Sequence, residues 1–259
     1  MNTIKRNGLY YLPDTKNPKK EHSLVSVTAV VGETYPKPQL LYWAARVAAR
    51  AALQDPSITE EQAVSAIGIA KKDGAIRGAT VHSLTEAVDN KAQVDIASVP
   101  PQFRGYALAH KKFTDDYLPE VLYNEQVVVN FKNGYAGRLD RIYTLRGKTA
   151  IVDFKTSPQY YREMGIQLSA YKNAEYMYNS DKKEYAPMVK VDQTMVVLLH
   201  DDGTYTVKDT DEPFWVFVYF KEIWLWMNKE KLEKVKIKRA QELKPKAQKE
   251  EPLEVVPEV

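Results

Sequence analysis

The sequence predicts an α/β protein with a central mixed β-sheet and helices on both of its faces. Apolar residues recur at helical spacing before residue 120 and again after residue 160, whereas residues 123–155 alternate as strands do. Asn133-Gly134 lies inside the alternating region, and Asn-Gly is a strong short-range signal for a hairpin. A second turn signal at Arg146-Gly147 completes a three-stranded antiparallel meander, which we place at the centre of the sheet.

The other elements are predicted from periodicity and from capping residues. Ser26 or Thr28 is placed to cap a short helix, and Thr59 begins a capping-box pattern for a helix that ends at Gly74. The expected elements are a short hairpin near residues 8–14, the short helix after residue 26, helices over residues 37–54, 59–74, 75–90, 100–120 and 160–178, a strand pair around residues 202–203, and a long helix from Pro213. The sequence contains no internal repeat that we can detect.

Composition narrows the classes of function. The chain has 259 residues, of which 44% are hydrophobic and 27% charged, as is ordinary for a globular protein. The formal net charge is only +3, so any basic surface for nucleic acid must be local. The chain has no cysteine, which excludes disulfides, thiolate metal sites and an iron–sulfur cluster ligated by cysteine. This composition suits a reducing cytosol.

The chain is long enough for one large domain or two small ones. We predict a single domain over residues 1–243. It would consist of a helical N-terminal part (1–73), a core that carries the chemistry (74–210) and a C-terminal helix (211–243). The charged, proline-containing residues 244–259 are predicted to be a disordered tail.

No segment has the pattern of a signal peptide or a membrane span. The first twenty residues lack an apolar core. The most apolar run, residues 214–227, is interrupted by Lys221 and Glu222 and is shorter than the roughly 20 residues that a span requires. We interpret this run as a core helix and expect no association with a membrane.

The turn at residues 146–147 places charged side chains on one face of the meander. A two-residue turn pairs Asp140 with Asp153, and directly opposite residues share a face of the sheet. Lys155 lies two residues past Asp153 and therefore shares that face. A four-residue loop would keep the same parity, whereas an odd-length loop or a bulge would separate the two acids.

The same count applies at the first turn, residues 133–134. A two-residue turn there pairs Val127 with Asp140 and Glu125 with Ile142. Glu125 then falls on the same face as the two aspartates. Its alternative role is that of an ordinary charge near the start of a strand.

Two carboxylates within about 5 Å repel each other unless a proton or a cation joins them. A hard divalent cation with oxygen ligands would relieve the repulsion between Asp140 and Asp153, and the backbone carbonyl of Phe154 could add a ligand. The alternative is an ion-pair cluster between Lys155 and the acids on an exposed face. Apolar residues on both sides of "AIVDFKT" favour the metal site.

The segments "GRLDRIY", "AIVDFKTS" and "QLSAY", in this order, resemble the PD-(D/E)XK nuclease superfamily, and most closely its RecB-like and phage exonuclease-like branch. The resemblance implies a restriction-endonuclease-like core. It also implies that Asp140 and Asp153 bind Mg²⁺ and that Lys155 orients or activates water. The chain has Gly-Arg-Leu-Asp in place of a literal Pro-Asp, and Asp in place of Glu before x-Lys, and the family tolerates both departures.

The resemblance extends to two helices. On the helix after the meander, Gln167 and Tyr171 match a Gln-x-x-x-Tyr pattern, which implies contact with the substrate backbone, the lysine or the site itself. On an upstream helix, Gly78 and His82 match Gly-x-x-x-His, which implies that His82 is a metal ligand. Glu86 lies one turn further, either as a partner of His82 or as a solvated charge. The alternative for each of these residues is ordinary helix packing.

Several residues are weaker candidates for nucleic-acid contact. Arginines on helices that should border the cleft, and hydroxyl groups just past Lys155, could bind phosphates. These candidates are Arg46, Arg50, Arg77, Arg104, Thr156 and Ser157. Taken one by one, each arginine is equally explained as a solvated surface charge, and Ser157 is explained by helix-start chemistry.

Together these features predict a Mg²⁺-dependent DNA nuclease, in which Mn²⁺ substitutes for Mg²⁺ and no iron–sulfur cluster takes part. The resemblance implies an exonuclease of phage-type recombination or repair, located in the cytoplasm of a bacterial or phage-infected cell. Its expected partner is DNA, with a single-strand-binding or annealing protein and self-association as further options. The alternatives are a structure-specific or restriction-type endonuclease and a non-catalytic DNA-binding or scaffold protein with the same fold.

Overall fold

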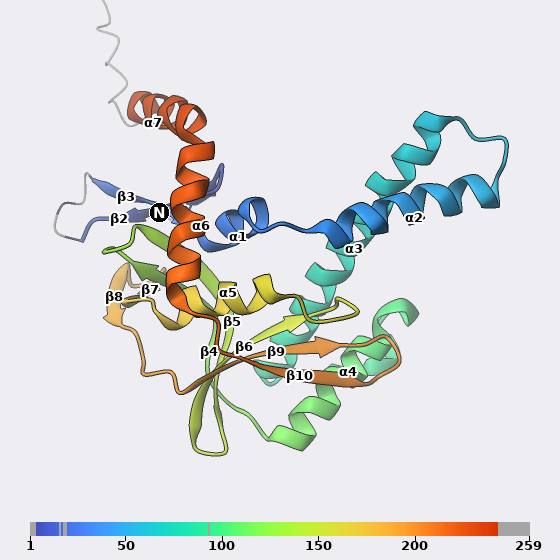
Figure 1. Cartoon of the computed structure of the whole chain (residues 1–259). Coiled ribbons are helices and arrows are strands. Elements are labelled where there is room, and N and C mark those ends of the chain that lie inside the picture. The colour runs from blue at the N-terminus through green and yellow to red at the C-terminus, as the bar shows by residue number, and fades with distance from the viewer. Residues whose placement is uncertain (1–3, 16, 18–19, 93, 243–259) are drawn as a thin grey trace, which may run out of the picture. The chain divides into compact units, whose positions relative to one another are not determined.

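The computed structural model describes residues 4–15, 17, 20–92 and 94–242 (Figure 1). Within them, one mixed sheet of ten strands is combined with helices, which confirms the predicted α/β class. The predicted disordered tail, residues 244–259, lies outside the described residues.

The elements alternate along the chain in the order β, α, β, α, β, α. The strands are β1 (Ile4–Arg6), β2 (Leu9–Pro13), β3 (Glu21–Ser26), β4 (Glu120–Asn130), β5 (Tyr135–Leu145), β6 (Lys148–Lys155), β7 (Tyr176–Asn179), β8 (Glu184–Pro187), β9 (Gln193–Leu199) and β10 (Tyr205–Thr210). The helices are α1 (Val27–Thr34), α2 (Pro38–Gln54), α3 (Glu60–Asp89), the short 3-10 helix η1 (Ile96–Ser98), α4 (Pro101–Tyr117), α5 (Arg162–Lys172), α6 (Phe214–Met227) and α7 (Lys229–Glu242).

Strand β5 lies at the centre of the sheet and has neighbours on both edges. Antiparallel β4 pairs with one edge of β5, β7 pairs with β4, and β8 pairs with β7. On the other edge, parallel β3 pairs with residues 135–136 and antiparallel β6 pairs with residues 141–145. Parallel β9 and then β10 extend the sheet beyond β6. Residues 137–140 of β5 therefore lie between the pairings with β3 and β6, and this interval contains Asp140.

The predicted two-residue turn between β5 and β6 is confirmed. Leu145 pairs with Lys148, and Arg146 and Gly147 have φ angles of 49° and 79°. Both central residues are thus left-handed, as the hairpin turn whose twist matches that of the strands requires. The register continues as far as the pair of Arg141 and Val152, so Asp140 and Asp153 are the next residues on the two strands.

The predicted two-residue turn between β4 and β5 is wrong. Asn130, not Phe131 or Lys132, is the last residue of β4 to pair, and its partner is Tyr135. The Asn130 side chain accepts a hydrogen bond from the backbone N–H of Asn133 at 2.7 Å, which stabilises a four-residue connection. The register is therefore shifted by two residues from the prediction, so Ile142 pairs with Tyr123 and not with Glu125. A shift of two residues leaves the side chains of residues 123–130 on their predicted face, whereas a second irregularity lies between Val121 and Tyr123.

Three predicted helix boundaries also differ. The helices expected over residues 59–74 and 75–90 form the single helix α3, because Gly74 lies among helix formers and weakens the helix without ending it. Its predicted capping box at Thr59 is confirmed. The helix expected over 160–178 ends at Lys172 and is followed by β7. The helix expected from Pro213 is interrupted at Asn228, between α6 and α7.

Contacts divide the chain into two compact units, residues 1–224 and 225–259, with the boundary inside α6. The first unit contains the whole sheet and helices α1 to α5. In the second unit, the described residues form the end of α6 and the helix α7. The single domain predicted over residues 1–243 stays a prediction.

Helices lie on both faces of the sheet at β6, where adjacent side chains point in opposite directions. Phe154 packs edge-on against Phe113 of α4, with ring centroids 5.6 Å apart. The neighbouring Asp153 faces α5, where its charge acts on the buried Tyr171 hydroxyl. The acidic face of the meander is thus the face that α5 covers.

His110 of α4 is a titratable side chain in the apolar core, so its protonation should make the stability of the fold depend on pH. It is 1% exposed and packs edge-on against Phe154, and its Nε2 lies 3.8 Å from Asp89 Oδ1. Burial lowers the pKa of His110 from 6.5 to about 4, although Asp89 opposes this shift. As the pH falls, the unfolded chain therefore takes up the proton before the folded protein does.

We expect the free energy of unfolding to contain a His110 contribution that is complete above about pH 6.5 and is lost down to about pH 4. One pKa unit corresponds to about 1.4 kcal/mol, so the loss over this window is about 3 kcal/mol. The measurement compares chemical unfolding of the wild type and His110→Gln between pH 7 and pH 4. The difference between the two should diminish by this amount as the pH falls. His22→Gln is the control, and an equal pH dependence in all three proteins would contradict the assignment.

Candidate functional site

A cavity of about 810 Å³ opens beside residues 137–140 of β5. Strands β1, β2, β4, β5 and β6, helices α1, α3 and α5, and Ser180 after β7 contribute to its lining. Among the residues singled out in the sequence, the lining contains His82, Glu86, Glu125, Asp140, Lys155 and Gln167. The structure thus brings together candidates that lie far apart in the chain.

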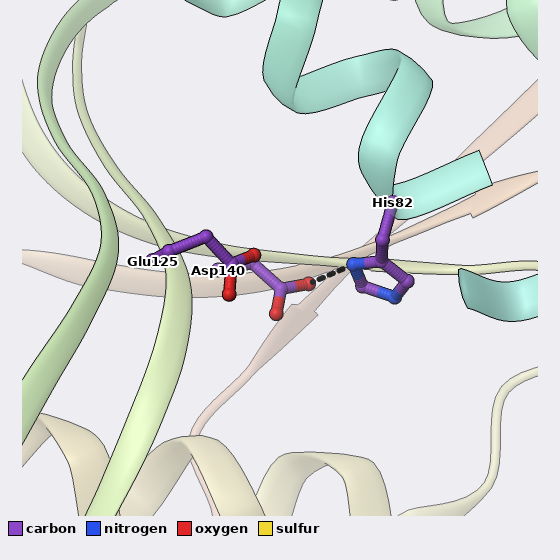
Figure 2. Close-up of side chains that lie close together, drawn as sticks. All are labelled: His82, Glu125 and Asp140. Carbon is purple, nitrogen blue, oxygen red and sulfur yellow. Dashed lines mark ion pairs between the residues drawn. The ribbon is translucent and has the colours of Figure 1, made fainter. Parts of the chain in front are cut away.

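Three of these residues form a group that could hold a metal ion. One ligand atom from each of His82, Glu125 and Asp140 lies within 4.8 Å of the other two. Figure 2 shows these side chains converging from α3, β4 and β5, with His82 Nδ1 3.3 Å from Asp140 Oδ2. The same Asp140 oxygen accepts the backbone N–H of Phe154 at 3.0 Å, which fixes the carboxylate between β5 and β6.

Glu125, which strand parity predicted on this face, lies at an irregularity in β4. Its φ angle is 47°, a left-handed conformation that is uncommon for a residue with a side chain. The ladder pairs Asn124 with Arg141 and Gln126 with Leu139, and so leaves Glu125 opposite Asp140 without a regular pair. The strain of such a residue amounts to about 1–3 kcal/mol and persists only where its surroundings fix it. Here the Arg138 guanidinium holds the carboxylate at 3.0 Å.

The buried Asp153 and the partly exposed Lys155 form an ion pair next to this group. Lys155 Nζ lies 2.6 Å from Asp153 Oδ2, and Asp153 is 1% exposed. Burial raises the pKa of Asp153 to about 6, against the effect of Lys155 and with that of Asp140. Burial also lowers the pKa of Lys155, but its acidic neighbours outweigh this and raise it. Lys155 is therefore a cation at neutral pH, suited to orienting water and neutralising phosphate charge.

The donor set fits a hard divalent cation. The three-residue group contributes two carboxylates and an imidazole, and Asp153 Oδ1 is buried with no hydrogen-bond partner among the described residues. Carboxylate oxygens are the ligands that Mg²⁺ prefers, and Mg²⁺ completes its shell with water and phosphate. Asp153 is not a member of the three-residue group, so its role as a ligand stays a prediction. The same holds for the Phe154 carbonyl.

Gln167 and Tyr171 lie at different depths. Gln167 lines the cavity, and its Nε2 donates to the Tyr171 hydroxyl at 3.0 Å. Tyr171 is fully buried, and a Cβ added to Gly137 would lie 2.5 Å from its ring. Tyr171 therefore supports Gln167 and the backbone beside Asp140, and it does not line the cavity.

The weaker candidates lie outside the lining. Arg46 and Arg50 are exposed on α2, and Arg77 is half-buried on α3. Ser157 donates to the carbonyl of Gln159, and Thr156 likewise does not line the cavity. Arg104 also lies outside the lining, and its guanidinium donates to the carbonyls of Val99 and Ala97 at 2.7 and 2.8 Å. Arg104 thus anchors the turn before α4.

Eight residues of the lining were not predicted as site residues, and two of them, Lys5 and Arg138, are cations. Lys5 of β1 donates to the Thr28 hydroxyl at 2.8 Å, and burial followed by the charge of Arg138 lowers the pKa of Lys5. Arg138 lies two residues before Asp140, so strand parity could have placed it on the same face. The polar N-terminal segment gave no comparable signal for Lys5 or Thr28.

Comparisons with known proteins add little to this geometry. No protein-family model and no curated protein matches the chain. Among solved structures, SSO0001 has a TM-score of 0.36 and 16% sequence identity, covering 78% of this chain and 75% of that one. A likeness at this level supports no conclusion about function. In the described part of the chain, every helix is too short or too polar to cross a membrane.

Proposed function

We propose that the protein is a Mg²⁺-dependent DNA nuclease that hydrolyses phosphodiester bonds. One observation carries the proposal: a group of two carboxylates and a histidine lines a cavity beside the ion pair of Asp153 and Lys155. The resemblance to PD-(D/E)XK nucleases, drawn from the sequence motifs, supports the same reaction. The group and the cavity do not depend on that resemblance.

His82, Glu125 and Asp140 are the residues that would hold the cation, with Asp153 beside them. A bound Mg²⁺ would neutralise phosphate oxygens and favour ionisation of water. Lys155 would orient the attacking water and stabilise negative charge at phosphorus. The water oxygen forms a bond to phosphorus as the bond to the leaving oxygen breaks, and that oxygen takes up a proton. The Gln167 amide, held by Tyr171, is placed to contact a phosphate or sugar oxygen of the strand.

Two cations of the cavity lining that were not predicted, Lys5 and Arg138, are suited to bind the phosphates that flank the scissile bond. Lys5 and Arg138 raise the local positive potential, and the ammonium of Lys5 contacts the neutral hydroxyl of Thr28. An anionic strand would relieve their mutual repulsion. We infer that these two cations bind the substrate backbone and take no part in the chemical step.

Lys5→Gln is expected to raise the KM for DNA several-fold with little change in kcat. Removing one phosphate contact should also lower the slope of log K against log salt by about 0.7–0.9. The measurement is filter or fluorescence binding of DNA at several salt concentrations, together with steady-state cleavage. Lys20→Gln, on an exposed residue before β3, is the control. An unchanged salt slope in Lys5→Gln would exclude the contact.

The finer parts of the proposal are exonucleolytic action, a role in phage-type recombination or repair, and a cytoplasmic location in a bacterial or phage-infected cell. A single-strand-binding or annealing protein, or a second copy of the chain, is a proposed partner. These parts are supported by the resemblance of the sequence motifs alone. Mn²⁺ is expected to replace Mg²⁺, since both accept oxygen ligands in octahedral geometry.

The experiment uses end-labelled linear DNA and closed circular DNA with Mg²⁺, and a parallel reaction with chelator. Progressive release of nucleotides from linear DNA, with closed circles intact, would support the exonuclease. Nicking or linearisation of closed circles would instead support a structure-specific or restriction-type endonuclease. If the wild type bound DNA but cleaved neither DNA nor RNA, the proposal of an enzyme would be wrong. The result would favour the non-catalytic DNA-binding or scaffold protein.

A further inference from the structure

Arg141 follows the candidate ligand Asp140 in the chain, and its side chain points to the opposite face of β5. The side chain is 0% exposed. A buried guanidinium is stable only if charged and polar partners satisfy its donors. Those partners come from α3, β4 and β5, the three elements that carry His82, Glu125 and Asp140.

On the side of α3, two successive hydrogen bonds through Thr85 connect Arg141 to the backbone of His82. Arg141 Nε donates to Asp89 Oδ2, and Arg141 Nη2 lies 3.3 Å from Thr85 Oγ1. The Thr85 hydroxyl donates in turn to the backbone carbonyl of His82 at 2.9 Å. Asp89 is itself buried and accepts the Tyr143 hydroxyl at 2.7 Å. The guanidinium therefore fixes the last turns of α3, and with them the position of His82.

The contacts with the two strands reach the other members of the group. Arg141 Nη1 donates to the backbone carbonyl of Asp140 at 2.8 Å and lies 3.4 Å from Glu125 Oε1. Glu125 is the residue with left-handed backbone, which needs partners to hold it. One guanidinium thus touches Glu125 and the backbone of Asp140 directly and reaches His82 through Thr85.

We propose that Arg141 is the positioning residue of the metal site: it holds α3, β4 and β5 at the separation at which His82, Glu125 and Asp140 can share one cation. This inference rests on the proposed function. Arginine suits the role because its planar fork donates in several fixed directions, whereas a lysine ammonium is a single point charge. Outer partners of this kind typically change metal affinity by about 10–100-fold when they are altered.

The direction in which the Mn²⁺ affinity changes on substitution of Arg141 distinguishes a positioning role from a purely electrostatic one. Arg141 is a cation near the site, so loss of its charge alone would strengthen the binding of Mn²⁺. Arg141→Lys keeps the positive charge but loses the planar guanidinium, whose donors point in several fixed directions. Weaker binding in this variant therefore reports lost geometry.

The test is calorimetric titration of the full chain with Mn²⁺ at a temperature where each variant is folded, with thermal unfolding measured in parallel. We expect Arg141→Lys to bind Mn²⁺ about 10-fold more weakly or worse. Tyr143→Phe is the matched control, because it removes a hydrogen bond to the same Asp89 but leaves the fork intact. It should lower the melting temperature and leave Mn²⁺ affinity within about twofold of the wild type, as expected for a group that acts on stability alone.

Thr85→Val keeps the test decisive if Arg141→Lys does not fold. This near-isosteric change breaks the two hydrogen bonds that connect Arg141 to His82, and we expect it to weaken Mn²⁺ binding several-fold. Wild-type affinity in Arg141→Lys, or in Thr85→Val where only that variant folds, would overturn the positioning role. A loss of affinity in Tyr143→Phe equal to that in Arg141→Lys would also overturn it. A wild type that binds no Mn²⁺ would overturn the proposed function itself, which is a distinguishable result.

Discussion

Asp140→Asn is expected to reduce Mg²⁺-dependent cleavage by about 10³-fold or more, because it removes one carboxylate from the three-residue group. The substitution keeps the size of the side chain. Its amide oxygen can still accept the backbone N–H of Phe154, so β5 and β6 should remain joined. The loss should therefore arise from the charge and not from the fold. Mn²⁺ binding, measured by calorimetry, should fall together with cleavage.

Asp209→Asn provides the matched control, since Asp209 is an exposed aspartate on β10 of the same sheet and lies outside the cavity lining. It should cleave linear DNA and bind Mn²⁺ as the wild type does. Wild-type cleavage by Asp140→Asn would remove Asp140 from the reaction and leave the cluster as an ion-pair network.

The class of the fold and the face of each meander strand could be predicted from the sequence, because both depend on local patterns. Alternation over residues 123–155 is a property of neighbouring residues, and Gly147 signals a tight turn directly. The connection after β4 was mispredicted by two residues because the Asn130 side chain, and not Asn133-Gly134 alone, decides its length. Strands β7 and β8 were missed because each has only four residues, and β7 continues the helical pattern that precedes it.

Within the site, motif and parity identified Asp140, Lys155 and His82, and the structure places all three in one cavity. Parity also placed Glu125 on this face, but only as a possible supporting acid, so its membership of the three-residue group was not predicted. The left-handed backbone of Glu125 is encoded by no periodic pattern. Asp153 lies outside the three-residue group and pairs with Lys155, so its expected role as a ligand stays a prediction.

The groups that support the site were missed for a different reason. The Arg141 side chain points to the face of the sheet opposite the acidic residues. The sequence gives no sign that Asp89 lies against Arg141. Helix α4, strand β4 and the first half of β5 separate the two residues in the chain, so only the tertiary fold brings them together. Local patterns therefore predict which residues can do chemistry, whereas long-range packing decides how they are held.

Lys155→Met is expected to reduce cleavage by about 10²–10³-fold while Mn²⁺ binding is retained or becomes tighter. Methionine keeps the length of the side chain and removes the ammonium that lies 2.6 Å from Asp153. Loss of a cation beside two carboxylates leaves more negative charge for a metal ion to neutralise. The chemical step loses the group that orients water and neutralises phosphate charge. Cleavage and metal affinity should thus change in opposite directions, whereas in Asp140→Asn they should fall together.

This contrast decides between two roles for the lysine, because a residue that only maintains the fold would affect cleavage and metal binding alike. Lys148→Met, at the exposed start of β6, changes the same residue type on the same strand away from the cavity and should behave as the wild type. Single-turnover cleavage of linear DNA and calorimetric titration with Mn²⁺ are the two measurements. If Lys155→Met lost Mn²⁺ binding while it remained folded, the lysine would be a structural partner of Asp153, and the assignment of the ammonium to the chemical step would be wrong.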